Sequence, residues 1–235
     1  MSERTVGLGI GAHTVVQDTA VYSFTQDSVL CANLAKAGTK DRVLDLGCGC
    51  GIIGILLLLK KNVREVVGLD INPSAVVLTR RNAASNGLAE RLYAVEGDAA
   101  DAAALLGYGA FDKAVCNPPY YAFDDGSGVY DVSKREGASP LENFVKGGAE
   151  CLRNGGDFTL VHKADRLCDA VTLFRKYGLE PKTATLIYPR AEGRADIFVM
   201  TARKGGKTGL IVDAVVLAKE DGSSGDRIRE IYGNG

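Results

Sequence analysis

The stretch Leu44-Asp45-Leu46-Gly47-Cys48-Gly49-Cys50-Gly51-Ile52-Ile53-Gly54 decides the fold class of this 235-residue chain. An apolar run ends there in glycines at alternate positions, and a second apolar run begins at once. Glycines after a strand let the backbone turn sharply and approach a ligand closely, and the helix that follows favours negative charge at its N-terminus. The stretch therefore predicts a strand, a nucleotide-binding loop and a helix.

Taken alone, this loop is compatible with two kinds of nucleotide ligand. Gly49, Gly51 and Gly54 fit the dinucleotide pattern G-x-G-x-x-G, and Asp70 lies where an acid that binds ribose is expected. Asp45, however, precedes the first glycine by two residues. An acid there suits a ligand with a cationic amino group and a sulfonium, and it is unfavourable beside a pyrophosphate. The pattern D-x-G-x-G-x-G thus favours S-adenosyl-L-methionine over NAD(P).

Strand-like and helix-like runs alternate along the chain. Strands are expected at 42–46, 65–69, 92–95, 111–116, 157–161, 183–187 and 197–202, and helices at 51–61, 73–86, 99–106, 140–152 and 166–177. Such alternation gives βαβ units. The last two strands have no helix between them and form a hairpin. The predicted fold is α/β, of the Rossmann-like class I methyltransferase type: a seven-stranded, mainly parallel sheet with an antiparallel last strand and helices on both faces.

One domain accounts for the whole length, with residues 1–40 as an N-terminal cap, 41–204 as the catalytic core and 205–235 as a C-terminal extension. The net charge of −1 gives no sign of a basic nucleic-acid-binding domain, so any such contact must come from a local patch. The longest apolar run, 52–59, is well short of the ~20 residues that a membrane span needs. The start lacks the apolar segment of a secretion signal, and a cytoplasmic location is expected.

The cysteines predict neither a disulfide framework nor a metal site. Cys48 and Cys50 form a C-x-C pair, but no second pair lies at zinc spacing. We therefore expect no metal. The six cysteines are Cys31, Cys48, Cys50, Cys116, Cys151 and Cys168.

A second motif, Asn117-Pro118-Pro119-Tyr120, follows the strand expected at 111–116. Because ligands bind outside the carboxyl ends of parallel strands, the motif is expected beside the nucleotide loop. The side-chain oxygen of Asn117 and the carbonyl of Pro118 can accept hydrogens from a planar amine and localise its lone pair. The prolines offer no competing donor, and Tyr120 offers a flat face for stacking. The alternative is that the motif has only a structural role, as a proline turn that ends a strand.

Two more acids have candidate roles in cofactor binding. Asp98 follows the third strand, where its carboxylate can accept a hydrogen bond from an adenine amino group. Asp70 is expected to bind the ribose hydroxyls, and its alternative role is that of an acid at the N-terminus of the helix that begins with Pro73. The two roles of Asp70 are compatible.

The glycine loop and the N-P-P-Y motif together resemble the S-adenosylmethionine-dependent amino-methyltransferases, which include adenine-N6 and protein glutamine-N5 enzymes. Further segments are similar to the bacterial tRNA1(Val) (adenine-37-N6)-methyltransferase family. They are Gln17 with 24–30, Arg135-Glu136, 162–167, Tyr188-Pro189, 204–206 and Ile231-Tyr232. The resemblance implies a tRNA substrate and N6-methyladenosine beside the anticodon as the product. Cys48 and Cys50 depart from the small polar residues commoner in the family, without blocking the cofactor.

The resemblance also completes the expected site. The cofactor-binding residues are Phe24, Asp27, Asp45, Gly47, Gly49, Gly51, Asp70, Ile71, Asp98, Ala99 and Asn117. Candidate substrate-binding residues are Tyr121, Lys134, Arg135, His162, Lys163, Arg166 and Arg190. The cations among them, with Arg194, could bind phosphates with an affinity that falls as salt concentration rises, or each could be an ordinary solvated charge. His162 could touch the substrate or be structural. The long segment 121–139 is expected to be a lid.

Three other functions remain open at this point. Protein glutamine-N5 methylation would use the same N-P-P-Y chemistry on a different acceptor. An NAD(P)-dependent oxidoreductase would use the G-x-G-x-x-G pattern. A non-catalytic RNA-binding module would retain the cofactor fold alone.

Overall fold

The computed structural model describes residues 3–18, 25–120 and 140–218, together with residues 223, 225, 227 and 228. The expected lid at 121–139 lies outside the described residues, as do the candidate site residues Phe24, Tyr121, Lys134 and Arg135.

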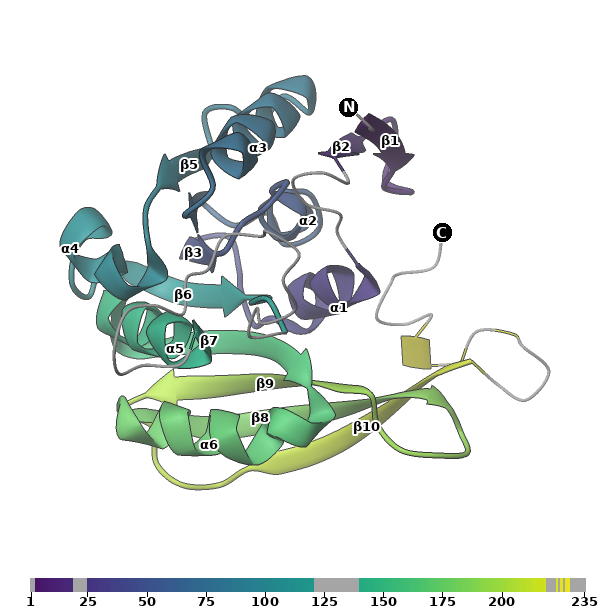
Figure 1. Cartoon of the computed structure of the whole chain (residues 1–235), viewed down its shortest axis with the longest axis vertical. Coiled ribbons are helices and arrows are strands. Elements are labelled where there is room, and N and C mark those ends of the chain that lie inside the picture. The colour runs from purple at the N-terminus through teal and green to yellow at the C-terminus, as the bar shows by residue number, and fades with distance from the viewer. Residues whose placement is uncertain are drawn as a thin grey trace, which may run out of the picture.

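Helices and strands alternate through most of the chain, as the sequence predicts (Figure 1). The strands are β1 Glu3–Gly7, β2 Thr14–Asp18, β3 Arg42–Leu46, β4 Glu65–Asp70, β5 Leu92–Glu96, β6 Phe111–Cys116, β7 Leu152–Lys163, β8 Leu179–Arg190, β9 Ile197–Lys204 and β10 Ile211–Ala218. The helices are α1 Gln26–Leu34, α2 Ile52–Lys61, α3 Pro73–Ser85, α4 Ala102–Leu106, α5 Pro140–Cys151 and α6 Leu167–Lys176, with short 3-10 turns at Ala99–Asp101 and Ala164–Arg166.

The central sheet has the strand order β10-β8-β9-β7-β6-β3-β4-β5. Within it β9 pairs antiparallel with both β7 and β8, and the other neighbouring strands pair in parallel. The predicted α/β class and the hairpin of β8 and β9 are therefore confirmed. The sheet has eight strands where the sequence predicts seven, and the antiparallel strand is not the last one.

The additional strand, β10, comes from the apolar run that follows the glycine–lysine segment 204–207. Gly205 and Gly209 have φ of +66° and +124°, so the backbone turns sharply between β9 and β10. The turn carries the chain past β8 and adds β10 parallel to it, with Ile211 opposite Thr183. The helix–strand alternation does not reveal this strand, because no helix precedes it.

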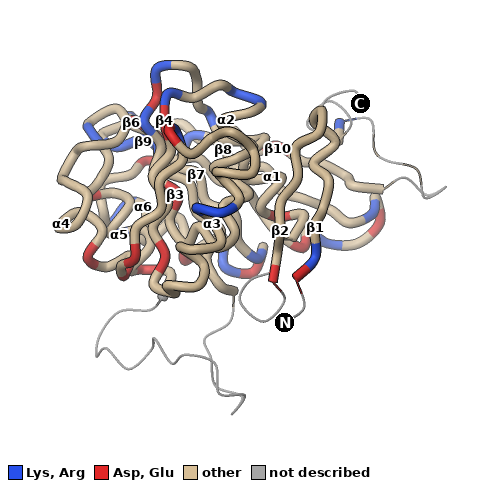
Figure 2. The backbone as a smooth tube through the Cα atoms, turned by 90° about the horizontal axis from the view of Figure 1, so that it is seen from above, with Lys and Arg blue, Asp and Glu red and all other residues tan. Residues whose placement is uncertain are grey.

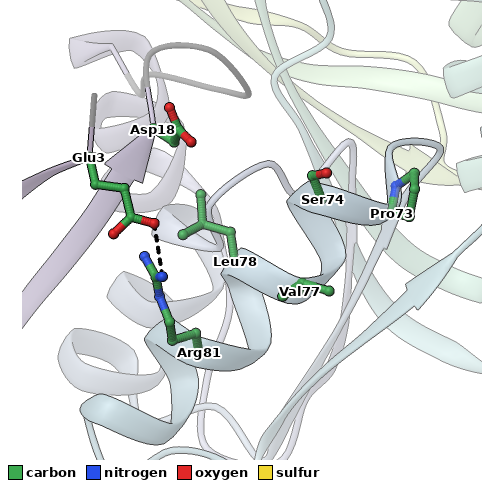
Figure 3. Close-up of a pocket in the computed structure, with 7 residues that line it drawn as sticks. All are labelled: Glu3, Asp18, Pro73, Ser74, Val77, Leu78 and Arg81. Atoms are coloured by element: carbon green, nitrogen blue, oxygen red, sulfur yellow. Dashed lines mark ion pairs between the residues drawn. The ribbon is translucent and has the colours of Figure 1, made fainter. Parts of the chain in front are cut away.

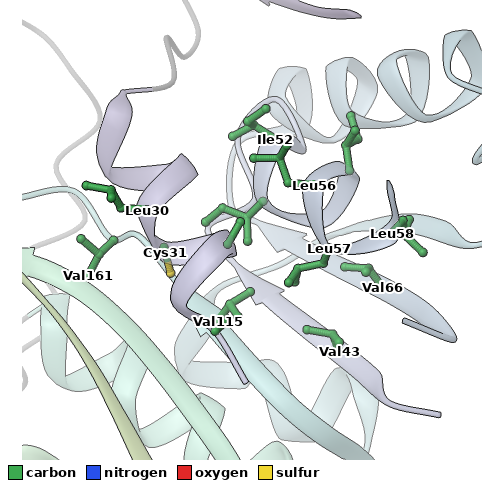
Figure 4. Packing of buried hydrophobic residues seen from close by; sticks show 14 of the residues in the cluster. Leu30, Cys31, Val43, Ile52, Leu56, Leu57, Leu58, Val66, Val115 and Val161 are labelled. Carbon is green, nitrogen blue, oxygen red and sulfur yellow. The ribbon is translucent and has the colours of Figure 1, made fainter. Parts of the chain in front are cut away.

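Two apolar cores form, one on each face of the sheet. The first contains Leu30 and Cys31 of α1, Ile52 and Leu57 of α2 and Val115 of β6 (Figure 4). The second joins α5 and α6 to the opposite face and contains four fully buried phenylalanines, which are Phe111, Phe158, Phe174 and Phe198. Successive residues of a strand point to opposite faces, so neighbours such as Val43 and Leu44 enter different cores.

The N-terminal hairpin of β1 and β2 lies against α3 through two asparagines one helical turn apart. Asn82 accepts a hydrogen bond from the Val16 N–H at 3.0 Å and donates to the Val16 carbonyl at 2.8 Å. Asn86 likewise accepts a hydrogen bond from the Thr14 N–H at 3.1 Å and donates to the Thr14 carbonyl at 2.7 Å. The side chains of α3 thus take the place of a neighbouring strand at the edge of β2.

A shallow cavity of about 330 Å³ lies between this hairpin and α3 (Figure 3). Glu3 of β1 and Arg81 of α3 form an ion pair of 2.9 Å beside it, and Asp18, Ser74 and Leu78 also line it. Because its charged lining residues are two acids and one arginine, the cavity has no strong single-sign charge.

Candidate active site

The glycine loop between β3 and α2 is held from the neighbouring strand by backbone hydrogen bonds. The N–H groups of Gly47 and Cys48 donate to the Leu69 carbonyl at 2.7 and 3.2 Å. The N–H of Gly49 donates to Asp70 Oδ2 at 2.9 Å. Gly47, Gly49 and Gly51 have φ of +71°, +56° and +82°, a region that disfavours any side chain. The predicted turn is therefore present, and it requires glycine.

Two buried polar side chains of α3 support the back of this loop, and sequence reasoning missed both. Thr79 Oγ1 donates to the Gly49 carbonyl at 2.9 Å, and Asn82 Nδ2 donates to the Cys50 carbonyl at 2.8 Å. A Cβ at Gly51 would lie 2.9 Å from the Thr79 side chain. The available signal was a threonine and an asparagine at i and i+3 on the buried side of a helix.

Asp45, at the end of β3, is a buried carboxylate directly before the loop. It is 1% exposed, and within the described residues neither oxygen accepts a hydrogen bond of normal geometry. Burial raises the pKa of Asp45 to about 7; the nearby N–H of Gly54 lowers it, and the charge of Asp70 raises it. An unpaired buried anion is costly unless a cation approaches it.

Asp70 ends β4 and fixes the shape of the loop. Its Oδ2 accepts from Gly49 and its Oδ1 accepts from the Asn72 N–H at 2.9 Å. Burial is the largest influence on Asp70 and raises its pKa, while these two backbone donors lower it. The N-cap of α3 is Asn72, whose side chain accepts from the Ser74 N–H, so Asp70 is an acid just before this helix and holds the N–H of its N-cap residue.

The segments after β4 and β5 bring three more candidate residues to the same edge of the sheet. Ile71 is 40% exposed, so it offers apolar surface at this edge. The Gly97 N–H donates to the Asp70 carbonyl at 3.0 Å, which joins the two segments. Asp98 Oδ1 accepts from the Ala100 N–H at 2.9 Å and caps the 3-10 turn that begins with Ala99.

The Asn117-Pro118-Pro119-Tyr120 motif begins where β6 ends. Leu46 of β3 is the register partner of Cys116 of β6, so the motif and the glycine loop leave adjacent strands at the same level. Asn117 is 8% exposed, Pro118 is buried, Pro119 is exposed and Tyr120 is half-buried. The structure thus brings the two predicted motifs side by side.

Helix α1 holds both ends of this motif. Asn117 Nδ2 donates to Ser28 Oγ at 2.8 Å, and Tyr120 Oη donates to Asp27 Oδ2 at 2.8 Å. Within the described part of the chain, Asn117 Oδ1 has no hydrogen-bond partner. Sequence reasoning missed Ser28; nothing in its spacing relates it to a motif 89 residues further on.

His162 and Lys163, at the end of β7, surround Tyr120. The His162 ring centroid lies 5.0 Å from that of Tyr120, and the Lys163 ammonium lies 5.6 Å from the Tyr120 ring centroid. His162 is 3% exposed, and burial lowers its pKa. Its Nδ1 accepts from the Lys163 N–H at 2.9 Å, so Nε2 carries the proton of the neutral ring.

The other candidate cations have different surroundings. Arg166 pairs with Asp169 at 2.6 Å, and Lys163 pairs with Asp196 at 3.1 Å. Arg190, the last residue of β8, and Arg194, in the turn before β9, are exposed and have no ion-pair partner among the described residues. Other basic residues gather at the amino ends of the strands, near α2 and β4 in Figure 2.

All six cysteines are free, and five of them are buried. Burial raises the pKa of the thiols of Cys31, Cys50 and Cys151 to about 12, so they stay protonated. The described residues contain no group of three or more His, Cys, Asp or Glu side chains that could hold a metal ion. No helix among them is long and apolar enough to cross a membrane.

The order β5-β4-β3-β6-β7-β9-β8 with β9 reversed, and the glycine loop after β3, define the class I methyltransferase fold. A solved protein from Agrobacterium tumefaciens, described as an O-methyltransferase, matches with a TM-score of 0.73 over 88% of this chain and 95% of its own. At 20% identity this likeness shows the fold alone.

The family model for the methyltransferase small domain matches residues 12–179, and the chain belongs to that family. It is 31% identical over 139 residues to a tRNA1(Val) (adenine(37)-N6)-methyltransferase of Porphyromonas gingivalis, covering 57% of this chain and 54% of the relative. It is 32% identical to a Methanocaldococcus jannaschii protein named for N5-glutamine methylation, covering 58% of this chain and 68% of the relative. The chain thus spans about half the length of the tRNA enzyme that it matches.

Proposed function

We propose that this chain is an S-adenosyl-L-methionine-dependent methyltransferase that methylates adenine N6 in RNA. A tRNA, with position 37 as the target, is the substrate that the family resemblance implies, and such a substrate fits a cytoplasmic enzyme. One observation carries the proposal. Asn117, whose Oδ1 has no hydrogen-bond partner in the described chain, begins its motif beside the glycine loop.

The residues around the glycine loop fit the cofactor. The unpaired Asp45 carboxylate offers a negative charge beneath the loop to a ligand that is cationic at both its amino group and its sulfur. Gly47, Gly49 and Gly51 leave room for close approach of the backbone. Each Asp70 oxygen accepts one backbone hydrogen bond and retains acceptor capacity for a ribose hydroxyl. A pyrophosphate beside Asp45 would face repulsion, which disfavours NAD(P).

The edge after β4 and β5 suits the adenine ring of the cofactor. Ile71 presents exposed apolar surface, and Asp98 lies beyond the end of the next strand. Ala99 is buried, and its carbonyl would lie 1.9 Å from a Cβ at Gly147, so α5 fixes its position. We propose Ile71, Asp98 and Ala99 as one wall of the cofactor site.

The chemistry requires alignment more than a strong base. When bound, the cofactor supplies a methyl group that its sulfonium already activates. Asn117 Oδ1 and the Pro118 carbonyl accept the hydrogens of the acceptor amine, which localises the nitrogen lone pair for attack on that methyl. With the cofactor bound, formation of the nitrogen–carbon bond would break the sulfur–methyl bond and leave a neutral thioether, and one amine hydrogen would leave as a proton to solvent. Tyr120 stacks on the acceptor ring, and such a contact is worth ~1–3 kcal/mol.

The remaining candidates are proposed contacts to the substrate. Lys163 and Arg190 are proposed to meet phosphates, and so is Arg166 once its exposed pair with Asp169 opens. We assign His162 to Tyr120 rather than to RNA, because its ring is buried against that of Tyr120. Tyr121, Lys134 and Arg135 retain their proposed substrate roles from the sequence alone.

Domain organisation also follows as a proposal. Because α1 of the segment 1–40 delivers Asp27 and Ser28 to the motif after β6, we propose that this cap and the core 41–204 act as one domain. The extension 205–235 contributes β10 to the sheet.

The test is transfer of a labelled methyl group to bulk bacterial tRNA that lacks the modification. We expect label in N6-methyladenosine after digestion to nucleosides. Label in no adenosine would contradict the proposed function.

A second candidate is protein glutamine-N5 methylation. It is favoured by the Methanocaldococcus jannaschii relative, of which the chain covers 68%. The amide nitrogen of glutamine is as poor a nucleophile as adenine N6 and needs the same acceptors. A glutamine-containing peptide offered in competition with tRNA decides between the two; preferential label in the peptide would favour this candidate.

A further inference from the structure

We propose that Ser28 is a positioning residue that orients the side-chain amide of Asn117 toward the acceptor amine. The inference rests on the proposed function, because it assigns Asn117 Oδ1 to the acceptor. It concerns a residue of α1, outside both motifs on which that function is based.

The orientation of the Asn117 amide decides whether the motif can work. An amide presents an acceptor oxygen at one end and two N–H donors at the other. Only the oxygen can accept a hydrogen from an amine. If the amide turned by half a revolution, its N–H groups would face the hydrogens of the acceptor, and the interaction would become repulsive.

Ser28 contacts one end of this amide and leaves the other open. Its Oγ accepts from Asn117 Nδ2 at 2.8 Å, in a bond between side chains that are 1% and 8% exposed. Oδ1 lies at the opposite end and has no partner among the described residues. A buried N–H left without an acceptor costs ~1–3 kcal/mol, so the bond to Ser28 favours the productive orientation.

The rest of α1 makes this support rigid. Asp27, the preceding residue, accepts from Tyr120 Oη at 2.8 Å. Leu30 and Cys31 lie in the first core, and the Cys31 thiol donates to the Cys116 carbonyl at 3.8 Å, directly before the motif. Two consecutive helical residues therefore hold the first and last residues of the four-residue motif.

The loss of Ser28 is expected to slow turnover without weakening cofactor binding. In Ser28→Ala the Asn117 amide loses its acceptor and populates the unproductive orientation. We expect kcat to fall about 10-fold or more. This fold-change corresponds to the free-energy cost, given above, of leaving the buried Asn117 N–H without an acceptor. Cofactor affinity and the KM for RNA should stay within about twofold of the wild type. Ser28→Thr keeps the hydroxyl and should restore most of the turnover.

A matched control separates orientation from stability. Thr159 and Thr201 form a buried hydroxyl pair of 2.9 Å within the sheet. Thr159→Val removes one buried hydroxyl, as Ser28→Ala does, but the partner of that hydroxyl is Thr201 and not a residue of the motif. The inference is contradicted if Ser28→Ala lowers kcat no more than Thr159→Val, or if Ser28→Ala weakens cofactor binding as much as it lowers kcat.

The Asn117→Asp background provides a second test. A carboxylate has an acceptor at both ends, so it needs no orientation. Ser28→Ala should then lower the residual rate far less than it lowers the rate of the wild type. An equal fold loss in both backgrounds would assign Ser28 a packing role only.

A readout without turnover keeps this inference separate from the proposed function. In the ¹⁵N-labelled full chain, the side-chain amide signals of Asn117 are assigned by their loss in Asn117→Asp. We expect slow exchange with solvent in the wild type and faster exchange in Ser28→Ala. Unprotected signals in the wild type would overturn the inference. If the signals are protected and no RNA is labelled, the proposed function fails and the positioning contact stands.

Discussion

The glycine loop after β3 and the N-P-P-Y motif after β6 lie on adjacent strands, yet they are held in different ways. The loop is held by backbone bonds from Gly47 and Cys48 to Leu69, and by side chains of the βα unit that follows it, namely Asp70, Thr79 and Asn82. The motif is held by side chains of α1, through Ser28 and Asp27, which come 89 and 93 residues earlier in the chain. Loop geometry follows from nearby sequence, whereas motif geometry depends on the N-terminal segment having docked.

The difference predicts that cofactor binding and turnover can be damaged separately. Asn117→Ala is expected to lower kcat by about 100-fold or more, because it removes an acceptor that acts on the reacting nitrogen. Cofactor affinity, measured by calorimetry, should change by less than about threefold. An equal loss of both quantities would mean that Asn117 belongs to the cofactor site.

Asp45 gives the largest expected change in stability. Burial raises its pKa in the folded state to about 7, above the ordinary aspartate value of 3.8, so ionisation opposes folding. The stability present below pH 3.8 is lost as pH rises through about 7. Asp45→Asn, which stays neutral, should therefore raise the free energy of unfolding of the cofactor-free protein by up to about 4 kcal/mol at pH 8. It should have little effect at pH 4.

Urea unfolding at the two pH values measures this effect. The same variant should bind the cofactor more weakly, because the negative charge beneath the loop is gone. A variant that is less stable than the wild type at pH 8 would show that Asp45 has a partner in the folded protein.

Gly51→Ala tests the glycine loop. A Cβ at φ +82° is strained and would lie 2.9 Å from Thr79, so cofactor affinity should fall by roughly 10-fold or more. Gly87→Ala is the control, since Gly87 also has positive φ, at +70°, and no atom within 4 Å of the added Cβ. Equal affinities of the two variants, measured by calorimetry, would show that the close approach to Thr79 has no influence.

The smallest effect is expected at the candidate RNA contacts. Arg190→Ala should raise the KM for RNA about two- to fivefold. It should also make the affinity for RNA less dependent on salt concentration, by the amount expected for the loss of one phosphate contact. Arg175→Ala is the control, because Arg175 is held by Glu180 at 2.8 Å. A salt dependence that is the same in Arg190→Ala and the wild type would leave Arg190 as an ordinary surface charge.

The sequence predicted what neighbouring residues determine. The glycine turn requires its own φ values, and the position of Asp70 follows from the length of one βα unit. Ser28, Thr79 and Asn82 could not be predicted, because each acts on a segment about 30 to 90 residues away through a single side-chain bond. The strand β10 was not predicted, because the other strands were recognised mainly by their alternation with helices and no helix precedes this apolar run.

The measurement that tests the central claim most directly is mass mapping of tRNA from cells in which this gene is deleted. The account predicts that N6-methyladenosine disappears from one tRNA position, returns with the wild-type gene, and does not return with Asn117→Ala. An unchanged tRNA modification pattern in the deletion strain would contradict it.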